Sequence, residues 1–198
     1  MDGLGETWQI AEATVKAYPV CAILQGPVDS MLKIVRTRGL DPDTVTEAVL
    51  ELSPYEATYP GIDNPGPFTS NTATKMSAQF SLGLALTDRA LTLDGLFRLD
   101  DAAICAQAKR VRIVADPTLA PRSSRLRLRL VDSGTLMEEV SSPVGQPSFD
   151  EIAAFSQTLV PELDVGRAAV DSLIREIAVL EQAPHLNRLF DKALFTAA

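Results

Sequence analysis

Apolar residues recur every three to four positions along several stretches of this chain, a spacing that places them on one face of an α-helix. In residues 27–38 the stripe begins after Pro27, which suits a first helical turn, and stops before Gly39, a common helix terminator. The same spacing predicts helices over residues 76–88, 93–97 and 102–110, with Asp100 or Asp101 as the N-terminal cap of the last one. These segments predict a layer of short helices.

Other stretches alternate apolar and polar residues, which predicts strands with one buried and one wet face. The predicted strands cover residues 45–52, 111–115, 126–131 and 136–140, and a turn at 132–134 joins the last two as a hairpin. Because the order is helix, strand, helices and then three strands, the pattern indicates an α+β fold. We expect a small mixed or antiparallel sheet that is covered by helices and followed by a C-terminal helical segment.

Arginine alternates with leucine in the third predicted strand, at Arg125, Arg127 and Arg129. This pattern predicts a charged face, which Glu138 and Glu139 across the turn are placed to neutralise. The alternative for this arginine face is an anion or nucleic-acid site.

The rest of the chain is divided by prolines and glycines. Residues 53–74 contain several of both and predict a long loop, a type of segment that is often functional or mobile. After Pro147, Ser148 and Glu151 have the spacing of a capping box. Helices are predicted over residues 148–160, 167–181 and 185–194. The predicted organisation is a hinge or lead-in helix at 1–15, an α+β domain at 16–147 and C-terminal helices at 148–198.

Composition narrows the functional classes. The 198 residues carry a formal net charge of −8, which argues against general nucleic-acid binding. No apolar run approaches the ~20 residues of a membrane-spanning helix, and the N-terminus lacks the pattern of a secretory signal. We therefore expect a soluble cytoplasmic protein without a membrane partner. The two cysteines, Cys21 and Cys105, have no metal-binding spacing, so neither a metal nor a cofactor is predicted.

Several motifs occur in an order that resembles one known family. They are Leu4-Gly5 with Trp8, Lys16-x-Tyr18-Pro19-x-Cys21, Thr72-x3-Met76-Ser77-x-Gln79-Phe80-Ser81, the run from Arg110 to Asp116-Pro117, and Gly145-x-Pro147. Together they are similar to the second half of the MmgE/PrpD family, which includes 2-methylcitrate dehydratase, cis-aconitate decarboxylase and iminodisuccinate epimerase. A full member of that family has a large helical domain with most of the polar catalytic groups, followed by a smaller α+β lid.

The resemblance also implies site residues, because the family's active site lies between the helical domain and the lid. It implies that Lys16, Tyr18 and Cys21 bind substrate, with the Lys16 ammonium holding a carboxylate. Without the resemblance, Lys16 would be taken as an exposed surface lysine and Cys21 as a small buried apolar residue. The resemblance assigns no nucleophilic role to Cys21.

Three further positions are candidates for catalysis. Relatives commonly carry histidine where this chain has Gln25, and glutamine forms hydrogen bonds but does not titrate. Tyr55 and Tyr59 bracket the place where relatives carry a tyrosine, so each is a candidate phenolic acid or substrate contact. A surface-packed loop aromatic is the alternative for both. The sole histidine, His185, lies far from these motifs along the chain and is expected at the start of a helix.

Three functions follow as hypotheses. In the first, the chain is the lid half of a split lyase or isomerase for a small acidic or carbonyl substrate. It would be inactive alone and would need a helical MmgE/PrpD-like polypeptide as its partner, in a dimer or heterotetramer. The start of the chain near the expected hinge and the early Trp8 motivate this hypothesis. In the second, the chain is a domain of a longer enzyme. In the third, it is a non-catalytic lid-like binding or regulatory protein, which the replacement of histidine by Gln25 would favour.

Overall fold

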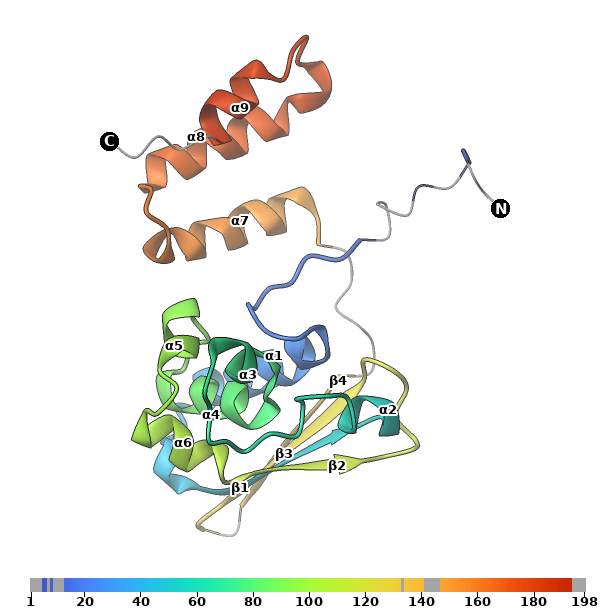
Figure 1. The fold of residues 1–198 in the computed structure, drawn as a ribbon, viewed down its shortest axis with the longest axis vertical. Helices are drawn as coiled ribbons and strands as arrows, with labels where there is room; N and C mark the ends of the chain where they lie inside the picture. The colour runs from blue at the N-terminus through green and yellow to red at the C-terminus, as the bar shows by residue number, and fades with distance from the viewer. Residues whose placement is uncertain (1–4, 7, 9–12, 133, 141–146, 194–198) are drawn as a thin grey trace. The chain divides into compact units, whose positions relative to one another are not determined.

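The computed structural model describes residues 5, 6, 8, 13–132, 134–140 and 147–193. The chain divides into two compact units, one formed by residues 16–145 and the other by residues 1–15 together with 146–198. Each unit is described by itself (Figure 1). Within the part of the chain that the structure describes, no helix is long and apolar enough to cross a membrane.

The described residues of the first unit include a four-stranded sheet. Its strands are β1 (Val45–Leu52), β2 (Val111–Ala115), β3 (Ser124–Leu130) and β4 (Thr135–Val140), in the spatial order β2-β1-β3-β4. β1 pairs parallel with β2, whereas β1–β3 and β3–β4 are antiparallel, so the sheet is mixed. The α+β fold class is therefore confirmed, and the predicted bounds of β1 and β2 match the structure.

Helices cover one face of this sheet (Figure 1). They are the 3₁₀ turn η2 (Ala22–Leu24), α1 (Gln25–Arg38), α3 (Asn71–Met76), α4 (Ala78–Asp88), α5 (Leu93–Phe97) and α6 (Ala102–Ala108). Gly39 ends α1 with a left-handed φ of 59°, and the Asp101 carboxylate accepts hydrogen bonds from the first turn of α6, as the sequence predicts. The core lies between the layers, where Met31, Phe80 and Leu126 are fully buried.

Helix α4 runs through the centre of this layer and is buried from Ala78 to Leu86. It crosses α6 closely at Gly83, because a Cβ atom added there would lie 2.9 Å from both the Ala108 nitrogen and the Ile104 carbonyl oxygen. Residue 83 must therefore be glycine for the two helices to pack at this separation.

Charged side chains lie on the other face of the sheet, at alternating positions of its strands. Arg125 contacts Glu139 on β4 at 3.0 Å and Glu51 on β1 at 2.7 Å, and Arg127 also pairs with Glu51. Arg129 pairs with Glu47 on β1. The predicted neutralised face is thus confirmed, although β4 supplies only Glu139, while β1 supplies Glu47 and Glu51 and Asp116 follows β2.

The expectation for Glu138 was wrong. Its position is opposite Leu126 in the register of β3 and β4, so it lies on the helix-covered side of the sheet. There its carboxylate pairs with Lys33 of α1 at 2.8 Å. Adjacent residues of a strand point to opposite faces, and Glu138 and Glu139 therefore have different partners.

The segment from residue 53 to residue 74 is more ordered than the predicted loop. It contains α2 (Pro54–Ala57) directly after β1 and the first turn of α3. Between them, Ile62 and Phe68 are buried in the core, at 0% and 9% exposure. The side chains that hold this segment are described with the site below.

The described residues of the second unit form the α-helices α7 (Phe149–Leu159), α8 (Arg167–Ala178) and α9 (Asn187–Ala193), with short 3₁₀ turns after α7 and α8. The capping box is confirmed, because the Ser148 hydroxyl accepts from the Glu151 N–H while the Glu151 carboxylate accepts from the Ser148 N–H. These hydrogen bonds hold the pKa of Glu151 below its usual value. In the lead-in segment, Gly5 and Glu6 form a turn, and Trp8 and residues 13–15 have no regular structure. Residues 1–4, 7 and 9–12, which include most of the predicted lead-in helix, lie outside the described residues.

Candidate functional site

Residues 16–21 form a bent segment that leads into η2 and α1, and the side chain of Gln25 holds it in place. The Gln25 Oε1 atom accepts a hydrogen bond from the Tyr18 N–H at 3.0 Å. Its Nε2 atom donates to the Tyr18 carbonyl oxygen at 3.0 Å, with longer contacts of 3.4 Å to the carbonyl oxygens of Val20 and Cys21. Both ends of the amide are therefore engaged with the backbone, which gives Gln25 a positioning role in addition to the predicted catalytic one.

Tyr18 is half-buried, and its hydroxyl donates to the Asp29 carboxylate at 2.9 Å. Burial of the phenol, and next the nearby Asp29 charge, raise the pKa of Tyr18 above its usual value of 10.0. The Tyr18 hydroxyl therefore stays protonated at neutral pH, where it serves as a hydrogen-bond donor. Lys16, two residues earlier, is exposed and makes no ion pair with any described residue.

The two principal motifs meet at Cys21. Its backbone N–H donates to the carbonyl oxygen of Lys75 at 3.0 Å, so the segment 16–21 lies against the C-terminal end of α3. The Lys75 ammonium lies 5.6 Å from the centre of the Phe97 ring, a distance typical of a cation–π contact. The Cys21 thiol is free and partly buried. The structure thus brings together Lys16, Tyr18, Cys21 and Gln25, and adds Lys75.

The motif residues Ser77 and Gln79 organise the segment before α3. The Ser77 hydroxyl donates to the Asn64 carbonyl oxygen at 2.6 Å. The Gln79 Oε1 atom accepts from the Asn64 N–H at 3.0 Å, and its Nε2 atom donates to the Asp63 carboxylate. Both motif side chains are buried. They fix a loop that the local sequence pattern left without structure.

Tyr55 and Tyr59 lie beyond the C-terminal end of β1, on or next to α2, and form a second group. Their rings make an edge-to-face contact with centroids 5.8 Å apart, and Tyr55 is 72% exposed. Between them, Glu56 is only 4% exposed. One Glu56 oxygen accepts from the Ser53 hydroxyl at 2.7 Å and the other from the Arg122 backbone N–H at 2.8 Å. This carboxylate therefore ties α2 to the connection between β2 and β3.

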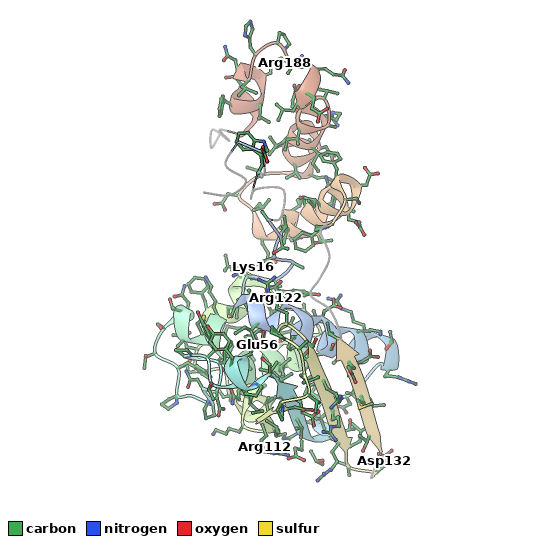
Figure 2. The ribbon with its side chains drawn as sticks, turned by 90° about the vertical axis from the view of Figure 1, so that its right-hand side faces the viewer. Lys16, Glu56, Arg112, Arg122, Asp132 and Arg188 are labelled. Atoms are coloured by element: carbon green, nitrogen blue, oxygen red, sulfur yellow. The ribbon has the colours of Figure 1, made fainter. Side chains whose placement is uncertain are left out.

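The labelled residues in Figure 2 show how these groups are arranged within the first unit. In this view Lys16 and Arg122 are labelled toward one end of the unit, Arg112 and Asp132 toward the other, and Glu56 between them. The sequence analysis did not single out Glu56 or Lys75. The Glu56 carboxylate gave no local signal, since one of its two partners, the Arg122 N–H, is 66 positions away along the chain.

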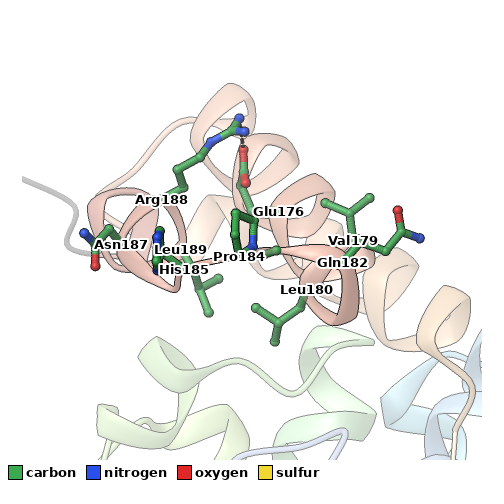
Figure 3. Close-up of a pocket in the computed structure, with 10 residues that line it drawn as sticks. Glu176, Val179, Leu180, Gln182, Pro184, His185, Asn187, Arg188 and Leu189 are labelled. Carbon is green, nitrogen blue, oxygen red and sulfur yellow. Dashed lines mark hydrogen bonds and ion pairs between the residues drawn. The ribbon is translucent and has the colours of Figure 1, made fainter.

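His185 lies in the second unit, where it lines a cavity of about 530 Å³ beside α8 and α9 (Figure 3). The ion pair between Arg188 and Glu176, at 2.8 Å, borders this cavity. Its apolar lining residues are Val179, Leu180, Ala183, Pro184 and Leu189. Among the described residues, no group of three or more histidine, cysteine or acidic side chains is placed to hold a metal ion.

The chemistry available at the Lys16 end of the first unit is anion binding and hydrogen bonding. Lys16 supplies an ammonium group, and Tyr18, Tyr55 and Tyr59 supply phenolic hydroxyls. The sequence-predicted residues form two groups, with Lys16, Tyr18, Cys21 and Gln25 in one and the two tyrosines near α2 in the other.

One comparison with known proteins bears on this arrangement. The model of the MmgE/PrpD C-terminal domain matches residues 18–152. The matched range includes both side-chain groups except Lys16, which lies two residues before it. Among curated proteins, none matches the chain.

Proposed function

The chain belongs to the MmgE/PrpD family, whose C-terminal domain its residues 18–152 match, and we propose that it is the substrate-binding lid of a lyase or isomerase of this kind. The proposed chemistry acts on a proton next to a carboxylate or carbonyl group, as in dehydration, decarboxylation, epimerisation or elimination. The substrate is a small acid or carbonyl compound.

The observation that carries the proposal is the state of Lys16. Its ammonium is exposed and has no ion-pair partner among the described residues, in a chain whose net charge is −8. The side-chain amide of Gln25 forms two hydrogen bonds of 3.0 Å with Tyr18, two residues after Lys16. One is with the Tyr18 backbone N–H and the other with its carbonyl oxygen. An ammonium without a protein partner is suited to the carboxylate of a ligand. Exclusion of water by a second surface would strengthen that attraction.

The proposal includes a helical domain that supplies the acid–base groups, on a separate polypeptide or elsewhere on a longer one. The group formed by Lys16, Tyr18, Cys21 and Gln25, with Asp29 bonded to Tyr18, contains no histidine, the side chain whose usual pKa lies nearest 7. Proton abstraction at neutral pH is most efficient from a group with such a pKa. The lid would then close the cleft and orient the substrate while the helical partner moves the proton. With the partner on a separate polypeptide, the assembly would be a heterodimer or a heterotetramer.

The test compares the chain alone with the chain plus a co-purified helical partner, on a panel of small hydroxy and carboxy acids. We expect turnover only in the complex. In the complex, Lys16→Ala should lower kcat/KM about tenfold to a hundredfold, the usual value of a charge-assisted contact. Lys109→Ala, at an exposed position after α6, serves as the control and should change nothing. Turnover by the chain alone, or equal effects of the two substitutions, would reject the proposal.

A second candidate is a lid that binds a ligand without catalysis. It is favoured by one observation: the position where relatives commonly carry histidine holds Gln25, whose amide is fully engaged with backbone groups. On this candidate, the complex binds a small acid with an affinity that depends on Lys16, but no product forms. Calorimetry and product analysis on the same sample distinguish the two candidates.

A further inference from the structure

Strand β4 lies at an edge of the sheet, where it pairs with β3 and with no other described strand. The Leu130 N–H donates to the Gly134 carbonyl oxygen at 2.9 Å, which makes these two residues a hydrogen-bonded pair. Hydrogen-bonded and non-hydrogen-bonded pairs alternate along an antiparallel ladder. The even-numbered residues of β4 therefore bond to β3, whereas the backbone N–H and C=O groups of Thr135, Met137 and Glu139 point away from it. These outward groups form no hydrogen bond with any described residue.

A free strand edge of this kind is a template for another strand, and charged side chains or prolines usually block it. The charged residues of β4 are Glu138 and Glu139, and both are already neutralised. The Glu138 carboxylate pairs with Lys33 at 2.8 Å. The Glu139 carboxylate pairs with Arg125 at 3.0 Å. β4 contains no proline, Met137 on it is 57% exposed, and a cavity of about 500 Å³ between α1 and β4 leaves room beside the strand.

We propose that β4 pairs antiparallel with β4 of a second copy of this chain, in the register centred on Met137, so that one sheet continues through both copies. This inference stands independently of the proposed function. A two-fold axis at the strand edge allows few registers in which the outward groups of both copies meet. Registers centred on Glu138 or Glu139 place two carboxylates directly opposite each other, which is destabilising. The register centred on Leu136 leaves Glu139 opposite a residue that precedes β4.

The register centred on Met137 avoids both faults. Met137 then lies opposite Met137 of the second copy, and Thr135 lies opposite Glu139. On the other face, Leu136 lies opposite Glu138. Each pair of outward residues exchanges two backbone hydrogen bonds. The exposed Met137 side chains meet at the axis, which removes apolar surface from water.

Charges on the outer face of the sheet also complement one another across this joint. Within one copy, Glu47 lies opposite Arg129, and Arg129 lies opposite Thr135. Across the joint, the same row continues with Glu139 and Arg125 of the second copy, which lie opposite each other. The signs therefore alternate along the row, with Thr135 as its neutral position. The Arg129 and Glu139 side chains, 69% and 44% exposed, flank Thr135 from its two sides.

Cysteine substitution tests the register. Residues opposite each other in a hydrogen-bonded pair have Cα atoms about 5.5 Å apart, a distance that a disulfide spans. Met137→Cys should therefore give a disulfide-linked dimer of the 198-residue chain under mild oxidation. Thr135→Cys is the matched control on the same strand and face, and it should not link to itself because it lies opposite Glu139. The parent, whose Cys21 and Cys105 are free, reports background linking.

Sedimentation equilibrium, up to millimolar concentration, measures the dissociation constant of the dimer. Thr135→Glu places a carboxylate opposite Glu139 of the second copy at two symmetric positions, so it should weaken the dimer about three- to tenfold. Within one copy the new carboxylate lies opposite Arg129, so the monomer should lose no stability. Thr135→Lys should have the reverse effects. Opposite signs for dimer affinity and monomer stability distinguish the interface from a general change in the fold.

Met137→Pro tests the backbone pairing. It removes an N–H that points away from β3, and an edge strand tolerates proline at such a position. The fold should persist, as circular dichroism would show, while the dimer weakens about tenfold or more. In the parent, the Thr135, Met137 and Glu139 amides should gain protection from hydrogen exchange as concentration rises, whereas the Leu136 amide, already bonded to β3, should not.

Three results would overturn the inference. They are a chain that stays monomeric at millimolar concentration, a dimer that Met137→Pro leaves unchanged, and equal linking of Met137→Cys and Thr135→Cys. Protection of the outward amides by a different polypeptide, in a chain that does not self-associate, would assign the edge to another partner and reject the second copy. None of these variants alters Lys16 or the segment that Gln25 holds, so each result leaves the proposed function as it stands.

Discussion

The amide of Gln25 offers the sharpest test of how the segment 16–21 is held. Gln25→Ala removes two hydrogen bonds of 3.0 Å to the Tyr18 backbone and two weaker contacts of 3.4 Å. A net value of about 1 kcal/mol for each good bond gives a loss of about 2 kcal/mol. The site is partly buried, so water replaces some of these bonds and the expected loss is about 1–2 kcal/mol. For a domain of this size the midpoint of thermal unfolding should fall by roughly 4–8 °C.

Gln25→Glu tests the direction of the same hydrogen bonds. The variant keeps an acceptor for the Tyr18 N–H, but it places a carboxylate where the Nε2 donor faces the carbonyl oxygens of Tyr18, Val20 and Cys21. Such an arrangement raises the pKa of the introduced carboxyl group, because its protonated form regains a donor. The variant should therefore be less stable than Gln25→Ala at pH 8 and recover toward the parent as the pH falls through the raised pKa.

The assay combines urea unfolding, followed by far-ultraviolet circular dichroism, with hydrogen exchange of individual amides. The Tyr18 amide should lose protection in Gln25→Ala, while amides in the centre of β1 change only with global stability. Gln182→Ala, at an exposed position in the second unit, is the control and should match the parent. An unchanged Tyr18 exchange rate in Gln25→Ala would show that this amide does not hold the segment.

Three further predictions concern stability. The pKa of Tyr18 is raised above 10.0 in the folded state, so its stabilising effect is complete below pH 10 and declines as the pH rises further. In Tyr18→Phe the free energy of unfolding should therefore fall less between pH 8 and 11 than it does in the parent. Gly83→Ala should cost about 1–3 kcal/mol in urea unfolding, because the new methyl group meets the α6 backbone at 2.9 Å, and an unchanged midpoint would contradict the close crossing. Glu56→Ala should lower the free energy of unfolding by about 2–4 kcal/mol, because the Ser53 hydroxyl and the Arg122 N–H lose their acceptor. Glu56→Gln keeps one acceptor and should lose less, and equal stabilities of the two variants would contradict the hydrogen-bonding role.

The sequence pattern was sufficient where an element's own residues decide its structure. The alternation in residues 45–52 predicted the bounds of β1, because its inward side chains need a single buried face. The bounds of β2 and α5 were predicted equally well, and the capping box identified the start of α7. The helix predicted from residue 76 instead begins at Ala78, after Ser77, whose hydroxyl caps the first turn.

The pattern was insufficient where distant polar side chains decide the structure. The segment between α2 and α3 was predicted as an unstructured loop, yet Gln79 contacts residues 15 and 16 positions before it and holds that loop. Likewise, Glu56 did not stand out, because its partner Arg122 is 66 positions away and the two meet only in the folded chain. Glu138 was assigned to the wrong face because its partner depends on the register of β4.

Several polar residues of the first unit act through the backbone segments that they hold. Gln25, Gln79 and Glu56 are engaged at both of their polar atoms, and each holds a different connecting segment. Lys16 has no ion-pair partner among the described residues, and it lies two residues before the Tyr18 backbone that Gln25 holds. Because that backbone is already ordered, a ligand bound by Lys16 would not have to order it as well. On this argument, loosening Gln25 should weaken the binding of an anionic ligand at Lys16.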